Sequence, residues 1–286
     1  MTWRFLISSL ALSLIILIPL SIKWEIPKRV TVPACFLIGI FTGLILYFIE
    51  AIYKMGFYQI LILQIFLILG ISASLLFWRF NRDPERVPPK DTNTILSPAD
   101  GKVIYVKSIE KGTIPFSEKK GREFSLGDFV QSDVLPSEGY LIGISMNFLN
   151  VHVNRAPVDG KVLLIRHIQG GFTSLKEKEA VVQNERALTV IDNGHFKVGI
   201  VQIASRLVRK IVLYLREGNE VHRGERIGMI RFGSQVDLVL PRVPLLHLEI
   251  KPGDNVKAGV SIVAEILEDK EDEGTLPGAI SERHLS

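Results

Sequence analysis

Three long apolar segments within the first 78 residues constrain this chain more than any other feature of its sequence. Residues 5–22, 30–49 and 57–77 are almost free of charge and are 18, 20 and 21 residues long. A helix needs about 20 apolar residues to cross the hydrocarbon core of a bilayer. The second and third segments therefore predict membrane-spanning helices, with a buried helical hairpin in a soluble core as the alternative.

The first apolar segment is more ambiguous than the other two. It is shorter and contains Ser8, Ser9, Ser13 and Pro19. A third span, an interfacial helix and the apolar region of a signal peptide are all compatible with it. No A-x-A cleavage pattern follows it, so we expect the segment to be retained, and the number of spans stays at two or three.

Basic side chains flank the apolar segments unevenly. Residues 23–29 hold three of them and residues 79–90 hold four, whereas the link between the second and third segments holds only Glu50 and Lys54. Because short basic loops favour the cytoplasmic side, both basic clusters are expected there. The sequence thus predicts a cell-membrane protein with a membrane anchor over 1–78 and a cytoplasmic domain over 79–286.

The composition argues against several classes of function. The net charge of +4 is too small to indicate a nucleic-acid partner. Cys35 is the single cysteine and lies in an apolar segment, so neither a disulfide framework nor a cysteine-based metal site is expected. The six histidines show no H-x-x-x-H spacing, and we therefore expect no metal in the site.

The part of the chain after residue 95 is typical of a mainly β domain. Short β-prone runs alternate there with Gly, Pro and Asp. These runs are Val103–Val106, Tyr140–Ser145, Val162–Ile165, Leu188–Ile191, Val198–Ile203, Ile211–Leu215, Ile227–Arg231, Val236–Leu240 and Ile262–Ile266. Only residues 174–179 favour a helix, and residues 112–138 indicate an inserted loop or hairpin. We expect a hybrid β-sandwich or barrel-like domain, with minor α+β character, behind the apolar helices.

Two pairs of segments inside this β region echo each other. The segment REGNEVHRGERIGMI (216–230) shares the pattern G-x-x-V-x-x-G-x-x-I with KPGDNVKAGVSIVAEI (251–266), and ADGKVIYV is similar to VDGKVLLI. Glycine suits such tight turns because it adopts positive φ without steric cost. The spacing resembles that of biotinyl and lipoyl carrier domains, although no carrier lysine is evident. A non-enzymatic, membrane-tethered carrier or adaptor is therefore the alternative function.

Three motifs hold side chains suited to chemistry. ILSPADGKV (95–103) places Asp100 in a turn, MNFLNVHVNRAPVDGKV (146–162) places His152 in an alternating run, and MIRFGSQVDLVLP (229–241) interrupts a β-prone run with Gly233-Ser234. Each has an ordinary explanation, since Asp-Gly is common in turns, a strand histidine is usually a hydrogen-bonded core residue, and a strand glycine often marks a bulge. No G-x-S-x-G motif supports a serine hydrolase.

Taken together, the motifs resemble the phosphatidylserine decarboxylase proenzymes, in their short prokaryotic form. The matching segments run in order over residues 78–241: WRFNRDPERVPP, LSPADGKV, NVHVNRAPVDGKV, QNER, VQIASRLVRKIV and RFGSQVDLVLP. The resemblance implies that the protein cuts its own Gly233–Ser234 bond into chains 1–233 and 234–286, which stay associated. It also implies that Asp100, His152 and Ser234 form the self-processing triad and that Ser234 becomes a covalent pyruvoyl (pyruvate-derived) cofactor.

The same resemblance implies the mature reaction. The pyruvoyl group would form a Schiff base with the serine headgroup of a membrane phospholipid, and phosphatidylserine would become phosphatidylethanolamine with loss of CO₂. Leu149 stands where the long form has a second histidine, so the proton donor stays open, with His152 as one candidate. Arg155 is a candidate for the substrate phosphate because its guanidinium donates in a fork, and an ordinary ion pair is its alternative role.

Some residues and properties receive no functional assignment from the sequence. His195 and His247 are expected to be structural. Asn184, Glu185 and Arg186 match a family motif without an assigned role. The linkage of the lipid chains, whether acyl or ether, and the formation of a homodimer also stay open.

Overall fold

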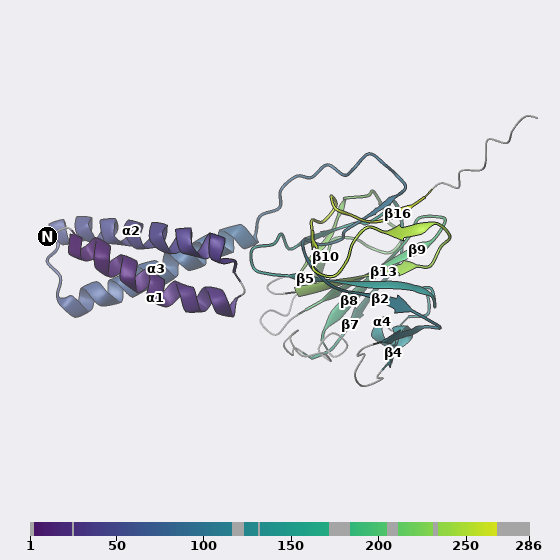
Figure 1. Cartoon of the computed structure of the whole chain (residues 1–286), viewed down its shortest axis with the longest axis horizontal. Coiled ribbons are helices and arrows are strands. Elements are labelled where there is room, and N and C mark those ends of the chain that lie inside the picture. Colours follow the sequence, from purple (N-terminus) through teal and green to yellow (C-terminus); the bar gives the residue numbers. More distant parts are fainter. Residues whose placement is uncertain are drawn as a thin grey trace, which may run out of the picture.

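The computed structural model describes residues 3–24, 26–115, 123–130, 132–171, 184–204, 211–230 and 234–267. They form a bundle of three long helices joined at one end to a β body (Figure 1). Helices α1 (Trp3–Lys23), α2 (Lys28–Ile52) and α3 (Phe57–Phe80) are each long and apolar enough to cross a membrane. The predicted apolar helices are therefore confirmed, and the ambiguous first segment forms one of the three.

Polar side chains of α1 bind the neighbouring helices. Ser13 Oγ donates a hydrogen bond of 2.8 Å to the carbonyl oxygen of Cys35 in α2. Gln64 Nε2 of α3 donates to the hydroxyl oxygens of Ser8 and Ser9, at 2.8 and 2.9 Å. Because the bilayer interior offers no water to satisfy such groups, these contacts favour association of the helices. The serines that made the first segment ambiguous are thus interhelical contacts.

One end of the bundle lies against the β body, and it is the end that holds both basic clusters. The link between α1 and α2 and the end of α3 both lie there, while the N-terminus lies at the far end (Figure 1). The Trp24 and Phe148 rings have centroids 5.7 Å apart, and Arg82 donates to the carbonyl oxygen of Leu149 at 2.9 Å. Loop 147–152 of the β body therefore contacts the end of the helix bundle.

The β body is built around an antiparallel eight-stranded sheet with the order β11-β7-β8-β9-β13-β5-β2-β15. Its strands are β2 (Gly101–Ile109), β5 (Gly139–Met146), β7 (Gly160–Ile168), β8 (Arg186–Asp192), β9 (Lys197–Ile203), β11 (Glu220–Val221), β13 (Ser234–Pro241) and β15 (Asn255–Val256). Strand β13 occupies an interior position between β9 and β5, where it pairs along most of its length with both neighbours.

Three smaller sheets complete the β body. Their members are β1 (Thr94–Leu96), β16 (Ile262–Ile266) and β14 (Leu246–Leu248), then β10 (Ile211–Leu213), β12 (Arg226–Ile230) and β6 (Val153–Arg155), then the hairpin of β3 (Thr113–Pro115) and β4 (Glu123–Ser125). A short helix, α4 (Leu126–Val130), follows that hairpin. The predicted mainly β domain, its nine strand regions and the hairpin within 112–138 are confirmed, whereas the helix-prone residues 174–179 lie outside the described residues.

Both faces of the central strands of the large sheet are buried, and successive side chains of a strand point to opposite sides. Val236, Leu238 and Leu240 of β13 contribute to the larger apolar core. Val239 belongs to the smaller core on the other face, together with Phe129 of α4. The sheet therefore lies between two apolar layers, which fixes the register of β13 and the position of Ser234 at its start.

The sequence echo corresponds to an approximate structural repeat. The Gly218 N–H donates to the carbonyl oxygen of Val162, and the Gly253 N–H donates to that of Val103, both at 2.8 Å. The two glycines have φ of +87° and +104°, a region that other residues rarely adopt. Each turn thus docks onto the strand that follows one of the two D-G-K-V motifs, and the β body contains two related halves.

Candidate functional site

His152 lies in the segment between β5 and β6, where the β body meets the helices. The side chain is fully buried, and its ring stacks on Phe80 at the end of α3, with centroids 4.1 Å apart. Burial lowers the pKa of His152 to about 4, although the Asn150 carbonyl and the Asp100 charge both act to raise it. The imidazole is therefore neutral at pH 7.

The two ring nitrogens of His152 have different surroundings. Nδ1 lies 3.0 Å from the carbonyl oxygen of Asn150. Since a carbonyl only accepts hydrogen bonds, Nδ1 carries the proton and Nε2 presents its lone pair. Nε2 is buried and has no hydrogen-bond partner within the described part of the chain. A neutral imidazole with a free lone pair is the state required of a general base.

Asp100 is buried beside this loop and accepts hydrogen bonds from several donors. Arg86 donates to both carboxylate oxygens, at 2.5 and 3.0 Å. The backbone N–H groups of Ala258 and Val151 donate at 2.9 and 3.3 Å. The contact with Val151 ties the carboxylate to the backbone next to His152.

The structure places Asp100 close to His152 without a direct hydrogen bond between their side chains among the described interactions. In a triad of this kind the carboxylate usually fixes the tautomer of the histidine, but here Nδ1 of His152 contacts the Asn150 carbonyl oxygen instead. Asp100 acts on the ring through its charge and through the Val151 backbone. Its membership of a processing triad stays a prediction.

The strand that begins at Ser234 is anchored near His152. Ser234 pairs with Met146 at the end of β5, just before the histidine loop. The Ile230 N–H donates to the carbonyl oxygen of His152 at 3.2 Å. The chain on either side of residues 231–233 is therefore attached to the two ends of the loop that carries the histidine. Gly233 and the side chain of Ser234 lie outside the described residues, so their part in the triad also stays a prediction.

Arg155 is buried in contacts with the segment that leaves the membrane. Its guanidinium donates to Asp83 at 3.2 Å, to the Pro84 carbonyl oxygen at 3.0 Å and to the Gly224 carbonyl oxygen at 2.8 Å. The ion pair that we considered as the alternative role is therefore present. A contact of Arg155 with a substrate phosphate stays untested.

Sequence reasoning missed three residues of this region, namely Phe80, Arg82 and Arg86. All three belong to the segment WRFNRDPERVPP, in which the arginines were interpreted only as membrane-flanking charges. In the structure, Phe80 covers His152, Arg82 binds the histidine loop, and Arg86 holds Asp100. The position of the arginines after an apolar segment predicts positive charge near the membrane, but it does not indicate which side chains or loops these three residues contact.

The QNER motif has a structural role in the residues described. Asn184 Nδ2 donates to the Ala204 carbonyl oxygen at 2.9 Å, and Arg186 Nε donates to the Phe129 carbonyl oxygen of α4 at 2.7 Å. These contacts join the start of β8 to the end of β9 and to α4. Asn184 and Arg186 thus have structural contacts, while Glu185 Oε1 lies 3.0 Å from His167 Nε2.

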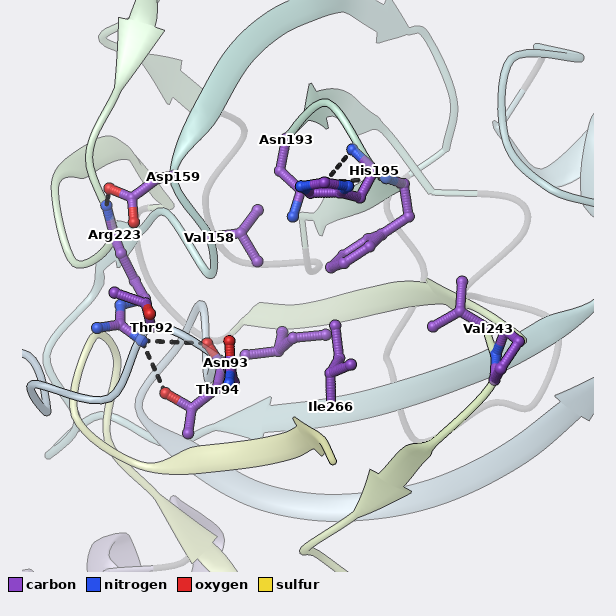
Figure 2. Close-up of a pocket in the computed structure, with 13 residues that line it drawn as sticks. Thr92, Asn93, Thr94, Val158, Asp159, Asn193, His195, Arg223, Val243 and Ile266 are labelled. Atoms are coloured by element: carbon purple, nitrogen blue, oxygen red, sulfur yellow. Dashed lines mark hydrogen bonds between the residues drawn. The ribbon is translucent and has the colours of Figure 1, made fainter. Parts of the chain in front are cut away.

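A hollow in the β body is lined by residues of β1, of β16 and of the turn between β8 and β9, among others (Figure 2). It has a volume of about 600 Å³, and its lining includes Asp159, His195 and Arg223. The Arg223 N–H donates to Asp159 Oδ1 at 3.0 Å, as the Ala258 N–H donates to Asp100 Oδ1 at 2.9 Å. Asp159 is thus the repeat counterpart of Asp100, but its side chain is exposed, and so is that of His222, whose Nδ1 lies 3.5 Å from Asp159 Oδ1.

A buried polar network connects β13 with β2. The Tyr105 hydroxyl donates to Asp237 Oδ2 at 2.6 Å, and Gln235 Nε2 donates to Asp237 Oδ1 and to the Tyr105 oxygen, each at 2.7 Å. Burial raises the pKa of Asp237 to about 6, against the opposing effect of these hydrogen bonds. The network fixes the first residues of β13 directly after Ser234.

Fold and site together define a membrane-associated β-domain protein with a buried histidine and carboxylate beside its apolar helices. The family model described as phosphatidylserine decarboxylase matches residues 73–264, and the chain therefore belongs to that family. The match begins in α3 and ends in β16, so it covers the histidine loop, Asp100 and Ser234 together.

Curated relatives agree with this assignment. A protein of Methanothermobacter thermautotrophicus, provisionally named archaetidylserine decarboxylase proenzyme, is 41% identical over 197 residues, which cover 69% of this chain and 83% of the relative. A protein of the same provisional name from Methanocaldococcus jannaschii is 40% identical over 70% of this chain and 94% of its own length. The phosphatidylserine decarboxylase proenzyme of Desulfotalea psychrophila is 36% identical, over 72% and 85%. The predicted family and its place in phospholipid biosynthesis are confirmed.

Proposed function

We propose that this chain cleaves itself between Gly233 and Ser234 and then decarboxylates a serine phospholipid with a pyruvoyl group derived from Ser234. The observation that carries the proposal is the buried Nε2 of His152, which has a free lone pair and lies in a loop attached to both sides of the 231–233 segment. The family and the proenzyme names of the relatives support both a decarboxylase and a processed precursor.

Processing begins when His152 Nε2 accepts the proton of the Ser234 hydroxyl. The Ser234 oxygen attacks the carbonyl carbon of Gly233, and the amide becomes an ester as the amine of Ser234 leaves with a proton. Loss of the Ser234 α-proton and cleavage of the ester C–O bond then leave Gly233 as a carboxylate and residue 234 as dehydroalanine. Water converts that residue to a pyruvoyl group and releases ammonia. Asp100 holds the histidine loop in place through the Val151 N–H during these steps.

The residues around His152 fit a pyruvoyl group at position 234, because Nε2 is an unpartnered buried acceptor in that region. Such a group supplies an electrophilic carbonyl and accepts the electron pair left when CO₂ departs. His152 holds the proton that returns to the substrate carbon, since Leu149 has no proton to give. Phe80 excludes water from one face of the imidazole.

The lipid and the orientation of the protein are also part of the proposal. The substrate is a glycerophospholipid with a serine headgroup, and the names of the relatives include both archaetidylserine and phosphatidylserine enzymes. The basic clusters at residues 23–29 and 79–90 lie at the β-body end of the bundle, and the positive-inside rule therefore supports a cytoplasmic β body.

A denaturing gel and an intact-mass measurement test this proposal on the full chain in lipid nanodiscs. We expect a C-terminal fragment of 53 residues whose first residue has a keto oxygen in place of its amine. Ser234→Ala and His152→Gln abolish the fragment, whereas the matched controls Ser108→Ala and His195→Gln retain it. A single intact chain that still releases CO₂ from serine phospholipids would refute processing, and an intact inactive chain would favour the carrier alternative.

A further inference from the structure

An apolar cavity of about 560 Å³ lies among the three helices. Its lining comes from the second half of α1, the first half of α2 and the second half of α3, which are the halves next to the β body (Figure 1). Pockets that bind small ligands usually have volumes of roughly 300–1,000 Å³. The cavity is therefore large enough for a ligand and lies at the depth of the leaflet that adjoins the site.

Most of the cavity lining is hydrocarbon. Three hydroxyl residues belong to its lining, but each donates its proton to a carbonyl oxygen of its own helix region. Ser21 bonds Ile18, Thr31 bonds Pro27 and Ser72 bonds Ile68. Since a polar ligand would lose its hydration without new partners, the lining favours a hydrocarbon chain.

Two chain segments connect the cavity to the buried histidine. Arg79 lines the cavity, and the next residue, Phe80, stacks on the His152 ring. Leu149 also lines the cavity, three residues before His152 in the loop. A molecule that leaves the cavity past these two residues therefore arrives at the imidazole.

Two arginines lie where the cavity lining meets the β body. Arg79 belongs to the lining, and Arg82 donates through Nη2 to the carbonyl oxygen of the lining residue Leu149. The Nε of Arg82 is buried without a hydrogen-bond partner among the described residues. A phosphate group at this point would supply both the missing acceptor and the opposite charge, as arginine guanidinium groups prefer.

We propose that this cavity binds one hydrocarbon chain of the substrate lipid and so positions its headgroup at His152, with the phosphate at Arg79 and Arg82. The inference rests on the proposed function, because the lipid is taken to be the serine phospholipid. The occupant is the chain of that substrate rather than a resident structural lipid, since the lining residues Arg79 and Leu149 belong to the two segments that reach His152.

Filling the cavity tests the proposal. Ala34 and Ala73 line it, whereas Ala51 lies exposed at the far end of α2. We expect Ala34→Phe and Ala73→Phe to lower the ratio of kcat/KM for a long-chain serine phospholipid to that for a dihexanoyl one by about tenfold, because chain burial is lost. Ala51→Phe leaves the ratio unchanged. An unchanged ratio in both cavity variants would overturn the inference.

A second measurement detects binding of the lipid chain in the cavity without relying on catalytic activity. The Ser234→Ala chain in nanodiscs is irradiated with a serine phospholipid that carries a diazirine at the end of one chain, and the labelled peptides are identified by mass spectrometry. Labels are expected within residues 17–38 and 69–79, displaced by excess unlabelled serine phospholipid and absent after Ala34→Phe. Labels spread over the outer helix faces, or cavity labels that excess substrate does not displace, would overturn the proposal.

The two measurements also separate the inference from the proposed function. If the unsubstituted chain releases no CO₂ from any serine lipid while the displaceable cavity label persists, the proposed function fails and lipid binding stands. If CO₂ release is normal but independent of chain length, and the cavity stays unlabelled, the function stands and the cavity inference fails.

Discussion

The rate of self-processing should reveal the buried state of His152 through its dependence on pH. Burial lowers the pKa of His152 from 6.5 to about 4. A difference of about 2.5 in pKa corresponds to about 3 kcal/mol of preference for the neutral ring. The histidine therefore remains a base down to about pH 4, and we expect a constant processing rate from pH 8 to about pH 5, followed by a tenfold fall per pH unit below pH 4.

Truncation of Phe80 tests the cause of this preference. The Phe80 ring covers the imidazole at a centroid distance of 4.1 Å and is itself buried. In Phe80→Ala, water reaches the imidazole and stabilises its charged form, so the pKa of His152 rises toward its ordinary value. We expect the midpoint of the pH profile to rise by about 1, and processing at pH 5 to slow while processing at pH 8 changes little.

The assay follows freshly synthesised precursor in nanodiscs, diluted into buffers between pH 3.5 and 8 and sampled on a denaturing gel. Phe77→Ala is the matched control, since Phe77 belongs to the same helix but is exposed. The same linkage affects folding. Because the unfolded ring binds its proton near pH 6.5, the stability contribution of the neutral ring is full above that pH and is lost as the pH falls toward 4. A midpoint near 6.5 in the unsubstituted chain, or no upward movement in Phe80→Ala, would refute the reasoning.

Three further substitutions test the contacts that support the site, each read as thermal unfolding of the full chain in nanodiscs. Arg86→Met leaves Asp100 buried without its cation and should cost about 3 kcal/mol, with loss of processing. Tyr105→Phe removes the hydroxyl that bonds Asp237, at a cost of about 1–3 kcal/mol. The pKa of Asp237 then rises further, so the variant loses more stability at pH 8 than at pH 5. Gly143→Ala places a Cβ 2.4 Å from the Tyr105 ring and should produce the same pH-dependent loss.

Two control variants accompany these substitutions, and two outcomes would contradict the predictions. Arg226→Met removes a more exposed guanidinium that also pairs with carboxylates, and it should destabilise the chain much less than Arg86→Met does, because solvent screens exposed ion pairs. Gly127→Ala places its Cβ no closer than 3.4 Å to other atoms and should be tolerated. Equal losses of stability in Arg86→Met and Arg226→Met would contradict the stabilising role of the buried Arg86–Asp100 ion pair. A loss in Tyr105→Phe that does not grow with pH would contradict the raised pKa of Asp237.

The sequence predicts the outline of the fold because its patterns are local. Charge-free runs of about 20 residues define helices, and alternating apolar residues between turns define strands, without knowledge of the neighbours. The first apolar segment was ambiguous because its serines are satisfied by residues that are distant in the sequence, such as Cys35 and Gln64. The echo of the two turns was visible because positive φ restricts both to glycine.

The site was predictable only as a set of residue types. The resemblance to the family predicts Asp100, His152 and Ser234 as site residues, but it does not indicate which partner each side chain contacts. In the structure, the Asp100 carboxylate accepts a hydrogen bond from Arg86, and Nδ1 of His152 contacts the Asn150 carbonyl oxygen. Such pairings depend on how the segment after α3 crosses the β body, and no local pattern in the sequence encodes that crossing.

The interior position of β13 has a consequence for the two chains that processing would create. A break before Ser234 interrupts the backbone, but β13 keeps its hydrogen bonds to β5 on one side and to β9 on the other. The small chain also supplies β16, which lies between β1 and β14. The two proposed products would therefore share the same sheets, and we expect them to stay associated for as long as the β body is folded.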